Sequence, residues 1–166
     1  MTAAVLILAV VTLQRLGELV LSRRNTKALL PGGAHEAEPG HYPLIVGVHV
    51  LWLASLWWLA PGKPVHWPLI FLFLILQLGR VWVLRTLGRR WTTRIIILPG
   101  EPLVARGPYR LVRHPNYLIA AGEIALLPLA FGLWEAALIF SLLNAAVLAI
   151  RIRAEERALS GLLPGA

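Results

Sequence analysis

Four long apolar stretches alternate with polar segments along the chain, and they predict its architecture. The apolar stretches are residues 3–21, 43–60, 67–84 and 117–150. A membrane-spanning helix needs about 20 predominantly apolar residues, so each of the first three predicts one spanning helix. In the fourth stretch, Gly132 and Glu135 predict a break into a hairpin of two helices of about 17 residues each, the low end of the spanning range. The pattern therefore predicts an all-α, polytopic membrane bundle of about five transmembrane helices, with one hairpin arm tilted or incompletely inserted.

Composition supports a membrane protein and excludes several other classes. Hydrophobic residues make up 58% of the 166 residues and charged residues 14%, whereas soluble domains have about 25% charged residues. The net charge of +8 suits an anionic membrane face, and because of the apolar runs we expect no nucleic-acid partner. The absence of cysteine excludes disulfides and thiolate chemistry. We expect a single domain over 1–166, with three transmembrane helices in 1–87 and a catalytic core in 88–166.

The distribution of basic residues predicts the orientation of the helices. With the N-terminus outside, Lys63 is the basic residue left in an outer loop, while segments 22–41, 88–116 and 151–157 fall inside with most of the arginines. Short cytoplasmic loops carry an excess of lysine and arginine. We therefore expect the second half of the chain to expose its polar segments, and its C-terminus, to the cytoplasm.

Two polar clusters flank the apolar hairpin, at 107–117 and 151–157. A hairpin returns its ends to one side, so the clusters are expected to meet. Pro115 suits the first turn of a helix, and a helix start beside arginines attracts an anion such as a carboxylate. On the return helix, Asn144, Arg151 and Glu155 share a stripe that is expected to face the bundle or a cavity. Simpler interpretations remain open: a basic patch that binds lipid head groups, and ordinary surface salt bridges.

Polar residues also occur at membrane depth. Arg15 and Glu18 are three apart and can pair. Because an isolated charge in hydrocarbon is costly, Glu123 is expected to find a cationic partner or to stay protonated. Structural pairing with Arg80 or Arg15 is one interpretation of Glu123, and a substrate contact or proton acceptor is the other. His49 is either a packed, hydrogen-bonded residue or a second substrate candidate. No two histidines have the spacing of a metal site, so no metal is expected.

Taken together, the two clusters resemble a known family. Four segments carry the resemblance, in this order: Gly107-Pro-Tyr-Arg, Arg113-His-Pro-Asn-Tyr117, an apolar hairpin, and Arg151-Ile-Arg-Ala-Glu-Glu156. Over about residues 82–159 the chain is similar to the isoprenylcysteine carboxyl methyltransferase family. The family in turn looks related to membrane phospholipid N-methyltransferases. The N-terminal half resembles the bacterial branch of this family in three runs: Gln14-Arg-Leu-Gly-Glu18, Arg24-Asn25 and His41-Tyr-Pro43. Some members of that branch O-methylate alkylpyrones and alkylresorcinols.

The resemblance implies an integral membrane methyltransferase of the bacterial inner membrane that uses S-adenosylmethionine. It implies O-methylation of a carboxylate, enol or phenol oxygen on a lipophilic small molecule or an isoprenylcysteine-like substrate, which enters from the bilayer among membrane lipids. Carried over by motif position, the cofactor-binding residues are Tyr109, His114, Pro115, Tyr117, Asn144 and Glu155. The residues tied to the reacting centre are Arg113, Arg151 and Glu156, while His49 and Glu123 are the substrate candidates.

Three other functions remain open at this point. One is N-methylation of a phospholipid amine, and another is a membrane reductase, since some sterol-reductase folds resemble this helical core. The third is a non-catalytic lipid-binding anchor, with arginines that hold anionic head groups.

Overall fold

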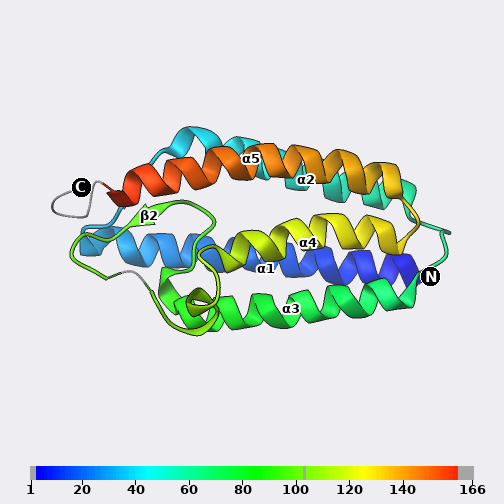
Figure 1. Cartoon of the computed structure of the whole chain (residues 1–166), viewed down its shortest axis with the longest axis horizontal. Helices are drawn as coiled ribbons and strands as arrows, with labels where there is room; N and C mark the ends of the chain where they lie inside the picture. Colours follow the sequence, from blue (N-terminus) through cyan, green and yellow to red (C-terminus); the bar gives the residue numbers. More distant parts are fainter. Residues whose placement is uncertain (1–2, 103, 161–166) are drawn as a thin grey trace.

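The computed structural model describes residues 3–102 and 104–160, and within them the chain forms a bundle of five long helices (Figure 1). The helices are α1 (Ala3–Leu29), α2 (Tyr42–Leu59), α3 (Trp67–Leu87), α4 (Pro115–Ala130) and α5 (Trp134–Ser160). Four short 3₁₀ turns connect them: η1 (Leu30–Gly32), η2 (Pro39–His41), η3 (Gly88–Arg90) and η4 (Gly107–Arg110). The expected all-α membrane bundle is confirmed. One small sheet is added, in which β1 (His35–Glu36) pairs antiparallel with β2 (Ile96–Ile97).

Four of the helices are long and apolar enough to cross a membrane, namely α1, α2, α3 and α5. The shorter arm of the hairpin is α4, whose 16 residues span about 24 Å at 1.5 Å per residue. Large apolar side chains cover the outside of the bundle, including Trp58 at 84% and Leu78 at 71% exposure. An apolar exterior of this kind suits lipid rather than water.

At one end of the bundle, which we call the polar end, the helices extend beyond the apolar stretches of the sequence. The segment after residue 21 was expected to be a loop, yet α1 continues to Leu29, and α5 continues through the charged residues after Ile150. The reason is that hydropathy marks the part of a helix that lies in lipid, not where the helix stops. α1 stops where Pro31, Gly32 and Gly33 follow, residues that break helices.

The expected break in the hairpin is confirmed at 131–133, opposite the polar end (Figure 1). Gly132 has a φ of 71°, a left-handed conformation that glycine adopts without strain. Pro128, one turn earlier, has no N–H and so leaves the carbonyl of Ile124 without its helical donor. Trp52 of α2 supplies that donor, because its indole nitrogen lies 3.2 Å from this carbonyl oxygen.

Glycine allows α3 and α4 to pack closely. A Cβ atom on Gly122 would lie 2.6 Å from a methyl carbon of Leu76, and one on Gly79 would lie 3.3 Å from Ile119. The backbones of the two helices are therefore close, and this contact fixes where α4 begins relative to the end of α3.

A cluster of polar side chains joins α1, α3 and α4 inside the bundle. Its members are Gln14, Arg15, Glu18, Gln77, Arg80 and Glu123. Glu123 is fully buried and accepts hydrogen bonds from Arg15 at 2.6 Å, from Gln77 at 2.7 Å, and from two nitrogens of Arg80. Glu18 binds Arg15 at 2.8 Å and lies 3.5 Å from Arg80. The charges of the two arginines and two glutamates balance. The hydrogen bonds confirm the structural interpretation of Glu123, which pairs with both Arg15 and Arg80.

The polar end is completed by the segment between α3 and α4. Asn25 of α1 holds its start, with hydrogen bonds to the carbonyls of Gly88 at 3.2 Å and Trp91 at 2.7 Å. Ser22 adds a bond to the backbone N–H of Thr93 at 2.8 Å. These contacts bring the segment over the end of α1, where it forms one wall of a cavity.

Candidate functional site

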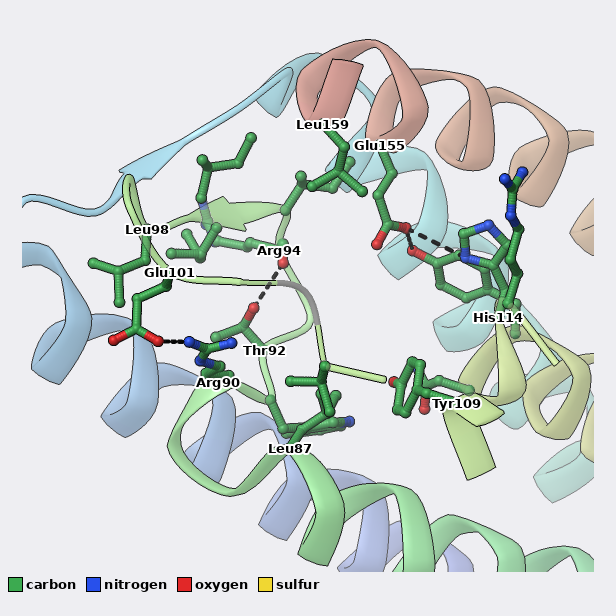
Figure 2. A pocket seen from close by; sticks show the side chains of 18 of the residues that line it. Leu87, Arg90, Thr92, Arg94, Leu98, Glu101, Tyr109, His114, Glu155 and Leu159 are labelled. Carbon is green, nitrogen blue, oxygen red and sulfur yellow. Dashed lines mark hydrogen bonds and ion pairs between the residues drawn. The ribbon is translucent and has the colours of Figure 1, made fainter. Parts of the chain in front are cut away.

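A cavity of about 750 Å³ lies at the polar end. Its walls are the start of α4, the last turns of α5, the end of α3, and residues from segments 90–102 and 104–105 (Figure 2). α5 extends past the start of α4 (Figure 1), so the α5 residues overhang the beginning of α4. The volume lies within the range of small-molecule and cofactor sites, about 300–1,000 Å³.

The start of α4 forms one side of this cavity. Pro115 occupies the first helical turn and is buried, where its missing N–H has no cost. The preceding carbonyl, of His114, accepts hydrogen bonds from the N–H groups of Tyr117 at 3.1 Å and Leu118 at 3.2 Å. The His114 and Tyr117 rings stack with centroids 5.2 Å apart, so both rings are presented together.

The two polar clusters meet, as the hairpin predicted. The Tyr117 hydroxyl donates a hydrogen bond to Glu155 of α5 and accepts one from Nε of Arg151 at 2.7 Å. The Arg151 guanidinium also lies 5.4 Å from the centre of the Tyr117 ring. Glu155 Oε2 is 3.9 Å from Nδ1 of His114 (Figure 2). Arg151 is 6% exposed, and the Tyr117 hydroxyl links its guanidinium to the carboxylate of Glu155.

The mouth of the cavity carries a looser pair. Arg113 and Glu156 both line it, with NH1 and Oε1 3.8 Å apart. Their side chains are 86% and 52% exposed, so both are free to reorient toward a ligand at low cost.

Tyr109 of η4 lies on the lower wall in Figure 2. Burial raises the pKa of its phenol to about 12, and the negative charge of Glu155 adds to the effect. The hydroxyl therefore stays protonated at neutral pH and is available as a hydrogen-bond donor.

Residues 95–98 form an apolar wall that the sequence did not indicate as part of a site. β2 within it is held by pairing with β1, and Arg94 binds both carboxylate oxygens of Glu36 at 2.7 and 2.8 Å. Arg94 also stacks on Tyr42, 4.4 Å from the ring centre, and the hydrogen bond to Glu36 raises the pKa of its guanidinium. The run Ile95-Ile96-Ile97 is apolar within an arginine-rich segment, but this pattern does not say which surface the segment covers.

Two further cavity residues have unpaired polar atoms. Trp91 is 3% exposed, and its indole nitrogen has no hydrogen-bond partner within the described chain; the same is true of Oδ1 of Asn116. Buried polar atoms without partners are uncommon. Asn116 belongs to the Arg-His-Pro-Asn-Tyr run and was detectable there, whereas no motif in the sequence includes Trp91.

Three of the residues expected at the site lie away from the cavity. Asn144 is buried on α5 but is not part of the cavity lining. His49, on α2, bonds through Nδ1 to the carbonyl of Ile45 at 2.9 Å, and Glu123 is occupied by the cluster between α1, α3 and α4.

Chemically, the cavity combines carboxylates, guanidinium groups, stacked aromatic rings and a helix start. Such a set suits a zwitterionic ligand with an aromatic part. Across residues 3–102 and 104–160, no group of three or more potential ligand side chains has an arrangement for a metal ion.

Comparison with known proteins agrees with the motif pattern. The profile of the isoprenylcysteine carboxyl methyltransferase (ICMT) family matches residues 69–161. A Bacillus subtilis (strain 168) protein, described as uncharacterized protein YpbQ, is 38% identical over 159 residues, which cover 93% of this chain and 95% of its own. An uncharacterized Haemophilus influenzae protein is 29% identical over 158 residues, covering 90% and 91%. No solved structure gives a significant match.

Proposed function

Because the chain belongs to the isoprenylcysteine carboxyl methyltransferase family, we propose that it is a membrane methyltransferase that uses S-adenosylmethionine and O-methylates a lipophilic acceptor. The observation that carries the proposal is the 750 Å³ cavity in which the start of α4 and the end of α5 meet through Tyr117, Arg151 and Glu155. When bound, the cofactor would supply a methyl group on a sulfonium: an oxygen of the acceptor would bond to the methyl carbon as the carbon–sulfur bond breaks, with S-adenosylhomocysteine as the leaving group.

The residues present fit this cofactor. Glu155 suits its ammonium group, and the start of α4 with Arg113 suits its carboxylate. The stacked rings of His114 and Tyr117 suit the adenine or the sulfonium cation. Tyr109, as a protonated phenol, adds a donor. Pro115 acts by placing the start of α4. Asn144 lies outside the cavity on the same helix as Glu155, so it would act indirectly, through α5.

Arg151 is the residue that we assign to the acceptor. A carboxylate or acidic enol is already an anion at neutral pH, so the protein needs to orient it rather than deprotonate it. Arg151 is buried against Tyr117, where a guanidinium holds an oxyanion strongly because little water competes. Glu156 at the mouth, or His49 deeper in the bundle, is the candidate base for a less acidic phenol.

The same arrangement supports an orientation in a bacterial inner membrane. The polar end carries the arginine-rich segments, and positive residues concentrate on the cytoplasmic side. We therefore place the start of α1 outside and the cavity in the cytoplasm. The apolar tail of the acceptor then reaches the cavity from the bilayer between helices.

Calorimetry on the full chain in detergent tests the cofactor. We expect S-adenosylmethionine and S-adenosylhomocysteine to bind in the micromolar range. Glu155→Gln should weaken binding by about 30-fold, the effect of about 2 kcal/mol for removing one partner of a charge pair. Glu135→Gln is the matched control, a glutamate on the same helix that lies outside the cavity. Folded protein that binds neither compound would refute the proposal.

The chemistry of the product tests the acceptor class. The full chain is incubated with methyl-labelled cofactor and a lipid extract, and the labelled lipids are treated with base. Base releases methanol from a methyl ester, whereas an ether of an enol or phenol and an N-methylated head group keep the label and separate by mass. We expect an ester or ether, lost in Arg151→Lys, which keeps the charge but not the planar fork. Label confined to ethanolamine lipids would favour phospholipid N-methylation instead.

A further inference from the structure

A second, smaller cleft lies beside the cofactor cavity, at the end of α3. Its volume is about 420 Å³, and it is open to the surface. Three of its eight lining residues are arginines, Arg89, Arg90 and Arg106, and none is acidic. A concave surface with this composition attracts an anion.

The three arginines differ in how far their charge is already balanced. Arg90 pairs with Glu101 and bonds the carbonyl of Pro102 at 2.7 Å. Arg106 makes one long bond, 3.5 Å to the carbonyl of Thr86. Arg89 is exposed and has no ion pair within the described part of the chain. Arg89 and Arg106 therefore bring unbalanced positive charge to the cleft.

The exposed face of α3 leads from the lipid-facing surface directly into this cleft. Leu78 is 71% and Trp82 47% exposed, and with Thr86 they follow one another at spacings of four residues, so the three share one stripe of α3. Thr86 lines the cleft, and so does Arg89, which follows α3 in η3. A single molecule with an apolar chain and an anionic head group would cover both the stripe and the cleft.

We propose that this cleft binds the phosphodiester head group of an anionic membrane phospholipid, with Arg89 and Arg106 as the phosphate ligands and an acyl chain along Leu78 and Trp82. Arginine binds phosphate oxygens through its planar fork, and the end of α3 lies where head groups meet water. The cleft shares the wall residues Leu87, Arg90, Pro102, Val104 and Ala105 with the cofactor cavity, so a bound lipid would also contact the framework of that cavity.

Native mass spectrometry of the detergent-purified full chain tests the assignment, without cofactor or turnover. The probes are dioleoyl phosphatidylglycerol, dioleoyl phosphatidylcholine and inorganic phosphate. We expect phosphatidylglycerol to bind at least about tenfold more tightly than phosphatidylcholine. The double variant R89Q/R106Q should weaken phosphatidylglycerol binding by about 30-fold, given about 1 kcal/mol for each basic residue near an anionic lipid.

The control is R23Q/R24Q, which removes the same charge from exposed positions at the end of α1, outside the cleft. It should leave the first phosphatidylglycerol site unchanged. Equal weakening in both double variants would show a diffuse surface charge effect and overturn the assignment. Displacement of phosphatidylglycerol by millimolar phosphate alone, or equal binding of the two lipids, would also overturn it. Loss of cofactor binding would not, because the cofactor does not enter this measurement.

Discussion

Replacing Glu123 by glutamine separates a structural role of this residue from a role in chemistry. The change keeps the size of the side chain but removes one of the two negative charges in the cluster between α1, α3 and α4. Glu123 is fully buried and accepts hydrogen bonds from Arg15, Gln77 and Arg80. The variant therefore leaves the cluster with two arginines against Glu18 alone.

The size of the effect follows from this charge imbalance. Removing one partner of a buried ion pair costs about 3–5 kcal/mol, because the other charge stays buried without compensation. We expect the free energy of unfolding of Glu123→Gln to fall by about that amount. Replacing Arg15 by glutamine as well restores neutrality, with Arg80 and Glu18 remaining 3.5 Å apart. The loss in the double variant should then be smaller than the sum of the single losses by about 1.5–3 kcal/mol.

The assay is equilibrium unfolding in mixed micelles of mild detergent and dodecyl sulfate, followed by circular dichroism. Binding of S-adenosylmethionine to the folded fraction is the control, and we expect it to be unchanged because Glu123 does not line the cavity. A Glu123→Gln protein that is as stable as the wild type but inactive would refute the structural reasoning. It would return Glu123 to the acceptor site.

Three other perturbations follow from single contacts. Trp52→Phe should lower the free energy of unfolding by about 1–3 kcal/mol, because the Ile124 carbonyl loses its donor. In a Pro128→Ala background a backbone N–H returns, so this loss should be smaller by about 1 kcal/mol. Equal losses in the two backgrounds would contradict this account. Because burial raises the pKa of Tyr109 to about 12, unfolding releases its proton between pH 10 and 12. The wild type should therefore lose stability as pH rises through that window and Tyr109→Phe should lose less; identical pH profiles of the unfolding midpoint would argue against the buried phenol. Asn25→Ala removes two hydrogen bonds to the segment after α3, and hydrogen exchange of that segment should speed up at least tenfold while α2 is unaffected.

Much of the candidate site was predictable because the relevant residues are local in sequence. Proline suits the first turn of a helix, so Pro115 marks a helix start in the sequence. The spacing of Arg151 and Glu155 puts both on one helix face. The hairpin then required that these segments meet, and Tyr117 joins them. Trp91 and residues 95–98 were not predictable as cavity residues, because nothing in their local pattern says which surface the connecting segment covers.

The roles of the charged residues at membrane depth show the same division. That Glu123 needs a cationic partner follows from the cost of a charge in hydrocarbon, which depends on the residue and its depth alone. Which residues bind Glu123 depends on the rotation of three helices about their axes. This rotation brings Arg15, Gln77 and Arg80 together around its carboxylate.

The sequence by itself determined that the protein is a helical membrane bundle, where its apolar helices lie, and which family motifs it carries. These follow from transfer of side chains and backbone into lipid and from residue spacing within one helix. The tertiary structure alone decided how far the helices extend beyond the lipid, which side chains close the cavity, and which arginines remain unbalanced at the cleft. Those features depend on close packing, such as Gly122 against Leu76, and on hydrogen bonds between segments that are distant in sequence, such as Asn25 with Gly88 after α3. Such contacts have no periodic signature in the chain, because their geometry exists only once the helices have packed.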